Sequence, residues 1–242
     1  MASFFGEVLA PRSRIFDDED LDAIEEAYCE EFRLSSQQEK EKKLLLVCDG
    51  PLPSAYSKIC SAGGQSSGEI LAKSFSRDVS IGQIIRGSDW TVVTCEQELK
   101  QPEFMILANT ILELSEPGCH IVCLTARHIS EYRSEVIDAD ESVVRCLASK
   151  SFPQSDSTKM LEVPNILTGL SAAILSISVV KDYPCYLLVN YVDLFTPDSI
   201  SLQGFQDMYQ LKSVQGSSLK KPNIAEALKA KQFFKNTSNL YI

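Results

Sequence analysis

An uncharged helix followed at once by an apolar strand is the feature that most constrains the fold of this chain. No charged residue lies between Val163 and Val180. Large apolar side chains recur there at the spacing of one helix face: Leu167, Leu170, Ile174 and Ile177. This pattern predicts an amphipathic helix over 165–181, with Asn165 as its cap and Pro184 preventing its continuation.

A buried strand is predicted directly after this helix. The run from Cys185 to Val192 is almost wholly apolar and is bounded by Pro184 and Asp193. Such a run is typical of a strand whose two faces are both covered by other elements. A helix followed by a buried strand is half of an α/β unit.

Further strands and helices are predicted in alternation along the chain. Strands are expected at 43–48, 90–95 and 119–125, and helices at 54–61, 68–76, 104–114, 140–149, 199–211 and 224–234. Strands that alternate with helices favour a parallel sheet. The predicted fold class is therefore α/β, with a single domain whose mostly parallel central sheet is covered by helices on both faces, followed by a flexible C-terminal tail.

Composition divides the chain into three parts. Residues 1–43 comprise an N-terminal arm, an acidic segment predicted to be a short surface helix, and a polar linker. Residues 44–234 form the predicted α/β domain, and residues 235–242 form the tail. The chain has 242 residues, of which 44% are hydrophobic, so it can bury a hydrophobic core without stabilisation by a disulfide or a metal ion.

The charge distribution disfavours nucleic acid as a partner. Nine acidic residues and no basic residue lie between Asp17 and Glu31, so the net charge of −10 leaves only −1 for all other residues. A chain without a basic surface lacks the attraction to phosphates that nucleic-acid binding needs. The acidic segment is interpreted as a solvated helix face, and a docking surface for a basic partner is the alternative.

Membrane insertion and secretion are also disfavoured. Polar residues dilute the uncharged span, among them Thr168, Ser171 and Ser178, which favours a buried helix over a membrane span. The N-terminus lacks the basic and apolar regions of a secretory signal. The eight cysteines lie mostly in apolar, strand-like runs, as reduced core thiols do. We expect a cytoplasmic location, with a nuclear one also open.

No cofactor or metal is expected from the motifs. The glycine-rich stretch 63–68 is followed by Glu69, where a phosphate-binding loop requires lysine. Cys119 and Cys123 share one face of a predicted strand, but His120 points to the other face, so the three side chains cannot converge on one ion.

His128 and Asp193 leave one catalytic alternative open. Each follows a predicted strand, and ligands of α/β proteins bind at the carboxyl ends of parallel strands. His128 could act there as a general base oriented by Asp193, as in a small-molecule enzyme of the nucleoside phosphorylase or hydrolase type. The interpretation we favour is that both are polar residues that complete strand ends and loops.

The last three residues, Leu240, Tyr241 and Ile242, predict a partner-binding tail. They follow a polar spacer at 235–239, which spans up to ~16 Å when extended. Two apolar side chains and a free carboxylate could fill a slot on another protein. Burying each apolar side chain contributes ~2 kcal/mol, and ordering the tail costs part of this energy. The tail alone therefore binds with about millimolar affinity, so the domain must contact the same partner as well.

Several stretches resemble the proteasome core-particle assembly chaperone family. The ending is a hydrophobic-tyrosine-any motif, and the other similar stretches are 4–8 (FFGEV), 124–132 (LTARHISEY), 164–166 (PNI) and 172–176 (AAILS), with Tyr191 and Asp193 beyond. The resemblance implies a non-enzymatic chaperone that forms a heterodimer with proteasome assembly chaperone 2 and binds proteasome α-subunits. It also implies that the chaperone promotes α-ring assembly, and that its tail blocks off-pathway ring dimers and premature activator binding.

The predicted helix at 165–181 is our hypothesis for the heterodimer contact. Its uncharged surface is wide enough to cover both a sheet and a neighbouring chain. The residues assigned to this contact lie on its apolar stripe: Leu170, Ala173, Ile174 and Ile177.

Overall fold

The computed structural model describes residues 31–35, 42–73, 78–97, 99–116, 118–134, 143–153 and 158–229. The predicted N-terminal arm and almost all of the acidic segment lie outside these residues, as do the spacer and the last three residues of the chain.

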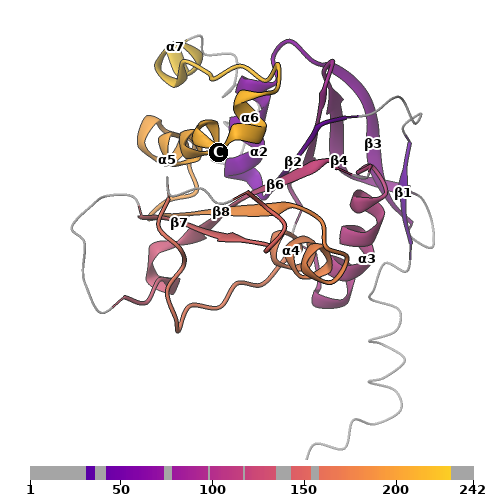
Figure 1. The fold of residues 1–242 in the computed structure, drawn as a ribbon. Helices are drawn as coiled ribbons and strands as arrows, with labels where there is room; N and C mark the ends of the chain where they lie inside the picture. The colour runs from indigo at the N-terminus through magenta and orange to yellow at the C-terminus, as the bar shows by residue number, and fades with distance from the viewer. Residues whose placement is uncertain are drawn as a thin grey trace, which may run out of the picture.

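One eight-stranded sheet runs through the protein in the order β1-β3-β4-β5-β2-β6-β8-β7 (Figure 1). In chain order the strands are β1 (Phe32–Leu34), β2 (Leu44–Asp49), β3 (Gln65–Lys73), β4 (Asp78–Arg86), β5 (Trp90–Cys95), β6 (His120–His128), β7 (Val143–Ala148) and β8 (Cys185–Val192). The central strands β5, β2, β6 and β8 pair in parallel, and the other pairings are antiparallel. The α/β single-domain prediction is confirmed, with a parallel centre extended by antiparallel strands at both edges.

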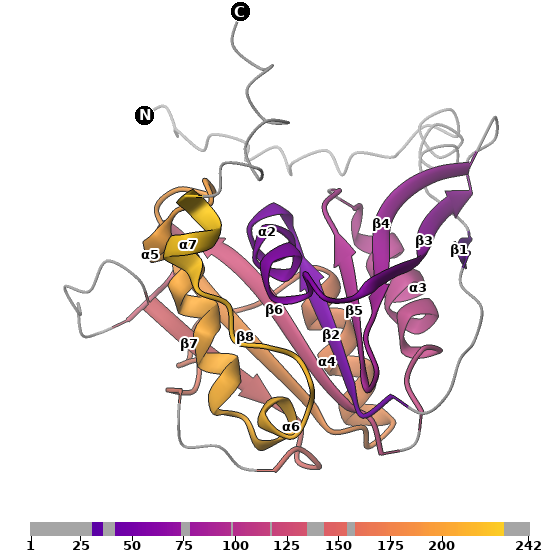
Figure 2. The ribbon, with the colours of Figure 1, turned by 90° about the horizontal axis from the view of Figure 1, so that it is seen from above.

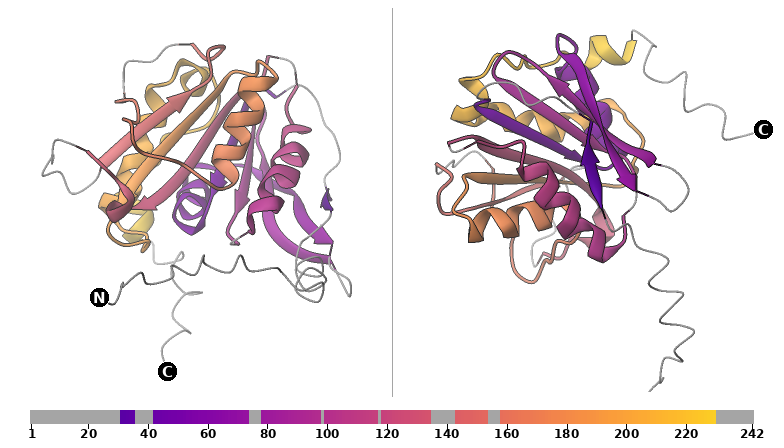
Figure 3. Two further views of the ribbon diagram at one scale, coloured as in Figure 1. Left: turned by 90° about the horizontal axis from the view of Figure 1, so that it is seen from below. Right: turned by 90° about the vertical axis from the view of Figure 1, so that its right-hand side faces the viewer.

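Helices cover both faces of this sheet. Helices α2 (Pro51–Cys60), α5 (Ser199–Gln203), α6 (Lys212–Gln215) and α7 (Ile224–Lys229) lie on one face, together with the 3-10 helix η2 (Gly204–Gln210) (Figure 2). Helices α3 (Gln101–Leu112) and α4 (Leu170–Val180) pack side by side on the other face (Figure 3). A short 3-10 helix, η1 (Ile129–Glu131), follows β6.

The central strands separate two hydrophobic cores. All eight residues of β8 are buried, as predicted for a strand covered on both faces. Leu187 packs into the core under α3 and α4, and the next residue, Leu188, packs into the core under α2 and α5. This alternation follows from the two-residue period of a strand.

Two predicted helices are strands in the structure. Residues 68–76 are predicted to be helical, but residues 65–73 form β3, which pairs with β4 and places Ile70 in the core. Residues 140–149 were also expected to be helical, but 143–148 form β7, antiparallel to β8. Tertiary pairing overrides helix propensity in both segments. Strand β4 and the short elements β1 and α6 were not predicted.

The outer edge of β7 is itself covered. Cys146 N donates to Lys159 O at 2.9 Å, and Leu161 N donates to Cys146 O at 2.9 Å. A parallel bridge therefore joins Cys146 to Met160. The segment that returns from β7 toward α4 thus satisfies backbone groups of the edge strand.

Helix α4 begins five residues later than the sequence predicts. Asn165 is not its cap, because its side chain is bound to the backbone of Arg133. Asn165 Oδ1 accepts a hydrogen bond from Arg133 N, and Asn165 Nδ2 donates one to Arg133 O, each at 2.8 Å. The residue before the helix is Gly169, at φ 96°. Few residues other than glycine adopt this backbone conformation, so the helix starts only after it.

Candidate functional site

A cleft of about 450 Å³ opens at the carboxyl edge of the parallel strands. It lies between the ends of β2, β5 and β6 and the start of α4, and its lining includes Asp49, Glu96, Thr125, Arg127, Gly169 and Phe195. This edge is where α/β proteins generally place their ligands. The polar groups in the cleft were therefore candidates for binding or catalysis.

The carboxylate of Asp49 is engaged by the helix that faces it. Asp49 Oδ2 accepts a hydrogen bond from Ser171 N at 3.0 Å. Burial raises the pKa of Asp49, and the hydrogen bonds from Ser171 and the charge of Arg127 oppose that rise. Because Gly169 has no side chain to cap α4, a residue at the end of β2 supplies the acceptor that a helix N-terminus needs.

Arg127 also performs a structural task in the cleft. Its guanidinium donates through Nη2 to the carbonyl oxygen of Thr168, directly before the start of α4. A side chain on Gly169 would lie only 3.1 Å from that nitrogen. The end of β6 is thereby tied to the loop that leads into α4.

His128 and Asp193 are not brought together as a catalytic pair. His128 Nδ1 lies 2.7 Å from Ser130 Oγ and accepts from Ser130 N at 3.2 Å, so the imidazole caps the turn η1. Its ring lies 6.5 Å from that of Phe195. Both residues lie in the described chain, and no hydrogen bond joins His128 to the exposed Asp193 there. This arrangement favours the strand-end interpretation over the general-base alternative.

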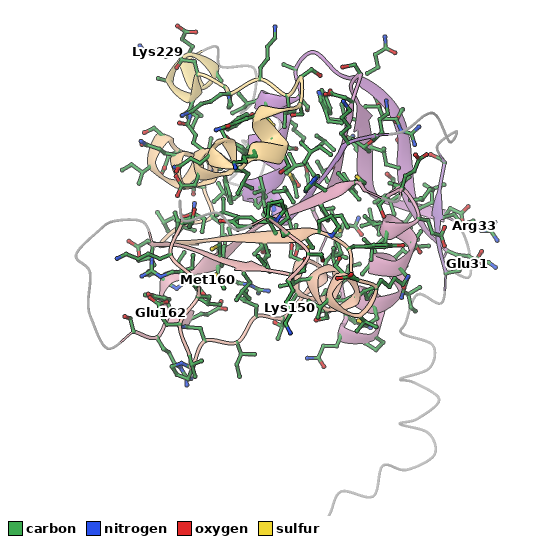
Figure 4. The ribbon with its side chains drawn as sticks, viewed as in Figure 1. Glu31, Arg33, Lys150, Met160, Glu162 and Lys229 are labelled. Carbon is green, nitrogen blue, oxygen red and sulfur yellow. The ribbon has the colours of Figure 1, made fainter. Side chains whose placement is uncertain are left out.

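A buried arginine organises the loop before α4. Arg145, on β7, is only 6% exposed, and its Nε lies 3.0 Å from both carboxylate oxygens of Glu162. Glu162 is labelled in Figure 4. Tyr132 donates its hydroxyl to Glu162 at 2.9 Å and stacks under the guanidinium, 5.0 Å from its Cζ. Burial would raise the pKa of Glu162, but hydrogen bonds from its own backbone, Tyr132 and Arg145 lower it. No sequence pattern indicates this network, because its members are far apart in the chain.

Two apolar side chains of the loop before α4 point into solvent. Val163, which directly follows Glu162, is 93% exposed. Ile166, which directly follows Asn165, is 85% exposed. Glu162 is held by Arg145, and Asn165 is held by the backbone of Arg133. The loop is therefore fixed at two points while its apolar residues face outward.

The residues assigned to a heterodimer contact on α4 lie inside the protein. Leu170 and Ile174 are fully buried, and Ala173 and Ile177 are less than 9% exposed, all in the core against the sheet. The surface of α4 that a partner can reach is the opposite one. The partner-binding residues predicted in the tail, Leu240, Tyr241 and Ile242, lie outside the described residues.

The described residues contain neither a metal-binding cluster nor a helix that could span a membrane. No group of three or more histidine, cysteine, aspartate or glutamate residues is placed there to hold a metal ion. No helix in the same part of the chain has the length and apolar character needed to cross a bilayer.

Comparison with known proteins identifies the family. The family model described as Proteasome assembly chaperone 4 matches residues 87–242, which is more than half of the chain. The chain belongs to the proteasome assembly chaperone family. The match begins in the turn between β4 and β5 and includes β5, β6, β8, α4 and the C-terminal residues 230–242.

Relatives of this chaperone agree with the assignment. Human proteasome assembly chaperone 1 is 31% identical over 111 residues, which is 45% of this chain but only 38% of the human protein. The zebrafish protein of the same name is 26% identical over 245 residues, covering 85% of this chain and 88% of that protein.

Solved structures share the fold of this chaperone at low sequence identity. Pyrococcus furiosus PbaA, an archaeal homolog of proteasome-assembly chaperone, superposes with a TM-score of 0.57 at 10% identity, covering 83% of this chain and 92% of that one. PbaB from the same organism, an archaeal proteasome activator, gives 0.57 at 11% identity and covers 83% and 95%. At such identities the likeness supports the fold alone.

Proposed function

We propose that this chain is a non-enzymatic chaperone that forms a heterodimer with proteasome assembly chaperone 2 and binds proteasome α-subunits through its C-terminal tail. The heterodimer would promote assembly of the α-ring in the cytoplasm or nucleus. It would also discourage off-pathway ring dimers and premature binding of activators. The observation that carries the proposal is the family match, which extends to the last residue of the chain.

The tail supplies the chemistry of the proposed contact. Leu240 and Ile242 are apolar, Tyr241 combines an aromatic ring with a hydroxyl, and a terminal carboxylate on Ile242 would add a negative charge. Such an ending can enter a pocket lined by apolar groups and a lysine. About millimolar affinity is expected for three residues alone, so the α/β domain must add contacts that raise the effective concentration of the tail.

The polar groups of the domain support a binding role over a catalytic one. Asp49 caps α4, Arg127 holds the loop before that helix, and His128 caps η1. Each of the three is engaged in positioning backbone. The candidate catalytic partner of His128, Asp193, makes no hydrogen bond with it, both residues being described.

The experiment that tests the proposal is co-purification of α-subunits with the full chain, compared with a chain lacking residues 240–242. Captured proteins are identified by mass spectrometry. We expect the wild type to retain α-subunits and the truncated chain to lose most of them. As a matched control, replacing Asn236, Thr237 and Ser238 with alanine keeps the ending intact and should leave capture unchanged. Equal capture by the truncated chain would refute the role of the tail.

A further inference from the structure

The outward surface formed by α3 and α4 differs from the other helical surfaces of this protein. We call it the helix-pair face and define it by the outward side chains Met105, Ile106, Asn109, Ser176, Val179 and Val180. The two helices pack against each other in parallel below the sheet (Figure 3). Lys181 Nζ lies 3.5 Å from Asn109 Oδ1, which places the end of α4 beside the third turn of α3.

The two helices of the helix-pair face present no charged side chain of their own outward, and Lys181, directly after α4, lies at its border. Helix α4 has no charged residue, and the single charged residue of α3, Glu103, is buried and caps its own helix. Helices that face water normally place charged side chains outward. The helices on the opposite face do so, with exposed Lys58 on α2, Lys212 on α6 and Glu226 on α7.

Large apolar side chains occupy this uncharged face. Val180 is 86% exposed, Val179 55% and Met105 48%. Ile106 is also exposed. Isolated apolar residues are normal on protein surfaces, but adjacent ones without intervening charge mark binding surfaces.

The polar side chains on the face are already satisfied by their own helices. Ser176 Oγ donates to Ala172 O at 2.8 Å, and Asn109 Nδ2 donates to Met105 O at 2.9 Å. Burying a polar group is costly when its hydrogen bond is lost. Because these donors keep their bonds, another protein could cover the face without leaving them unpaired.

From these features we infer that the helix-pair face is the surface that contacts the second chaperone of the heterodimer, and that it meets an uncharged, apolar surface of that chain. This inference rests on the proposed function. It also corrects the contact assigned from sequence, since the buried stripe of α4 cannot be shared with a neighbour and its outward side can.

The place where the described chain ends favours the second chaperone over the α-subunits as the occupant. The described chain ends at Lys229 on α7, which lies on the opposite side of the sheet from α3 and α4 (Figures 1 and 4). A tethered ending acts most strongly close to its point of attachment. The α-subunits held by the tail would therefore lie nearest to the α5–α7 layer, leaving the helix-pair face to the other partner.

The test introduces a charge on each helix of the face. Val179→Glu and Met105→Glu are made separately, one on each helix, and Ile200→Glu is the matched control because Ile200 is an exposed apolar helix residue of the opposite layer. Each full-length chain is titrated with species-matched proteasome assembly chaperone 2. Complex mass is measured by light scattering, and melting temperature verifies folding.

We expect Val179→Glu and Met105→Glu each to weaken heterodimer formation at least tenfold, and Ile200→Glu to change it less than twofold. Wild-type affinity in both face variants would overturn the inference while leaving the proposed function intact. The inference would also be overturned if the face variants lost α-subunit capture but paired normally, because the face would then contact α-subunits. It would be overturned as well if the wild type formed a homodimer that Val179→Glu dissociates, because the face would then contact a second copy of this chain. Failure of the wild type itself to pair would instead refute the heterodimer in the proposed function.

Discussion

Asp49 caps a helix that begins far later in the chain: its Oδ2 accepts a hydrogen bond from the backbone nitrogen of Ser171, 122 residues away in sequence. Helix α4 starts after a glycine and has no capping side chain of its own. The carboxylate at the end of β2 therefore couples the parallel centre of the sheet to the helix that covers it. The same bond explains why a prominent acidic group in the cleft is structural.

Removal of this cap should destabilise the protein. We expect Asp49→Ala to lower the free energy of unfolding by about 1 kcal/mol, the usual cost of losing an N-terminal cap. Asp49→Asn keeps an oxygen acceptor and should retain most of that stability at neutral pH. Urea unfolding of the two variants and the wild type measures the difference. Equal stability of Asp49→Ala and wild type would show that the bond contributes nothing.

The same residue should make stability depend on pH. Burial raises the pKa of Asp49 above its ordinary value of 3.8. The folded state then binds the proton of Asp49 more tightly than the unfolded state does. The stability that this proton contributes is therefore complete below the pKa of the unfolded state, and it is lost as pH rises through the raised pKa of the folded state. Relative to Asp49→Asn, which does not titrate, the wild type should lose stability as pH rises upward from about 4. Unfolding free energies measured between pH 4 and 7 check this, and a constant difference would contradict it.

The pair formed by Arg145 and Glu162 should respond unequally to its two deletions. Glu162→Ala leaves the guanidinium of Arg145 buried without its carboxylate, and we expect a loss of about 2 kcal/mol, below the usual range because Glu162 is 40% exposed. Arg145→Met fills similar space and leaves Glu162 able to reach water and Tyr132, so its cost should be smaller.

The control for that pair is Glu31→Ala, which removes ion pairs between exposed groups. We expect it to change stability little, because solvent screens such pairs. Denaturant titration of the three variants ranks them. An Arg145→Met loss larger than that of Glu162→Ala would contradict the expected order.

Gly169 should not tolerate a side chain. Its φ of 96° disfavours any residue with a Cβ, and an added Cβ would lie 3.1 Å from Arg127 Nη2. We expect Gly169→Ala to cost about 2 kcal/mol. Gly63→Ala is the matched control, because nothing lies within 4 Å of the Cβ it would add and its φ is not in the left-handed region. Thermal unfolding of both variants measures the effect, and similar melting temperatures would refute it.

Central elements were predictable from sequence because burial on both faces leaves a strong local pattern. Strands β2, β5, β6 and β8 are short apolar runs, and α3 and α4 have helical spacing. Edge strands do not leave this pattern. In β3 only Ile70 is fully buried, so its helix-forming residues misled the prediction, and β7 was missed although its paired valines favour a strand.

The functional surface was only partly predictable for a different reason. The hydrophobic stripe of α4 was recognised, but a stripe does not reveal whether it faces a partner or the protein's own sheet. The structure places Ile174 against the sheet and Val179 in solvent. The network of Arg145, Glu162 and Tyr132 depends on three segments meeting in space, which single-sequence periodicity cannot detect.

The covered edge of β7 limits how this protein can associate with copies of itself. Exposed strand edges can recruit further strands and seed open-ended aggregates. Here the segment around Met160 already occupies backbone groups on that border of the sheet. A neighbouring strand cannot pair with the main chain at Cys146, so recognition at that point depends on side chains, which a sequence can tune, and not on the main chain, which every polypeptide shares.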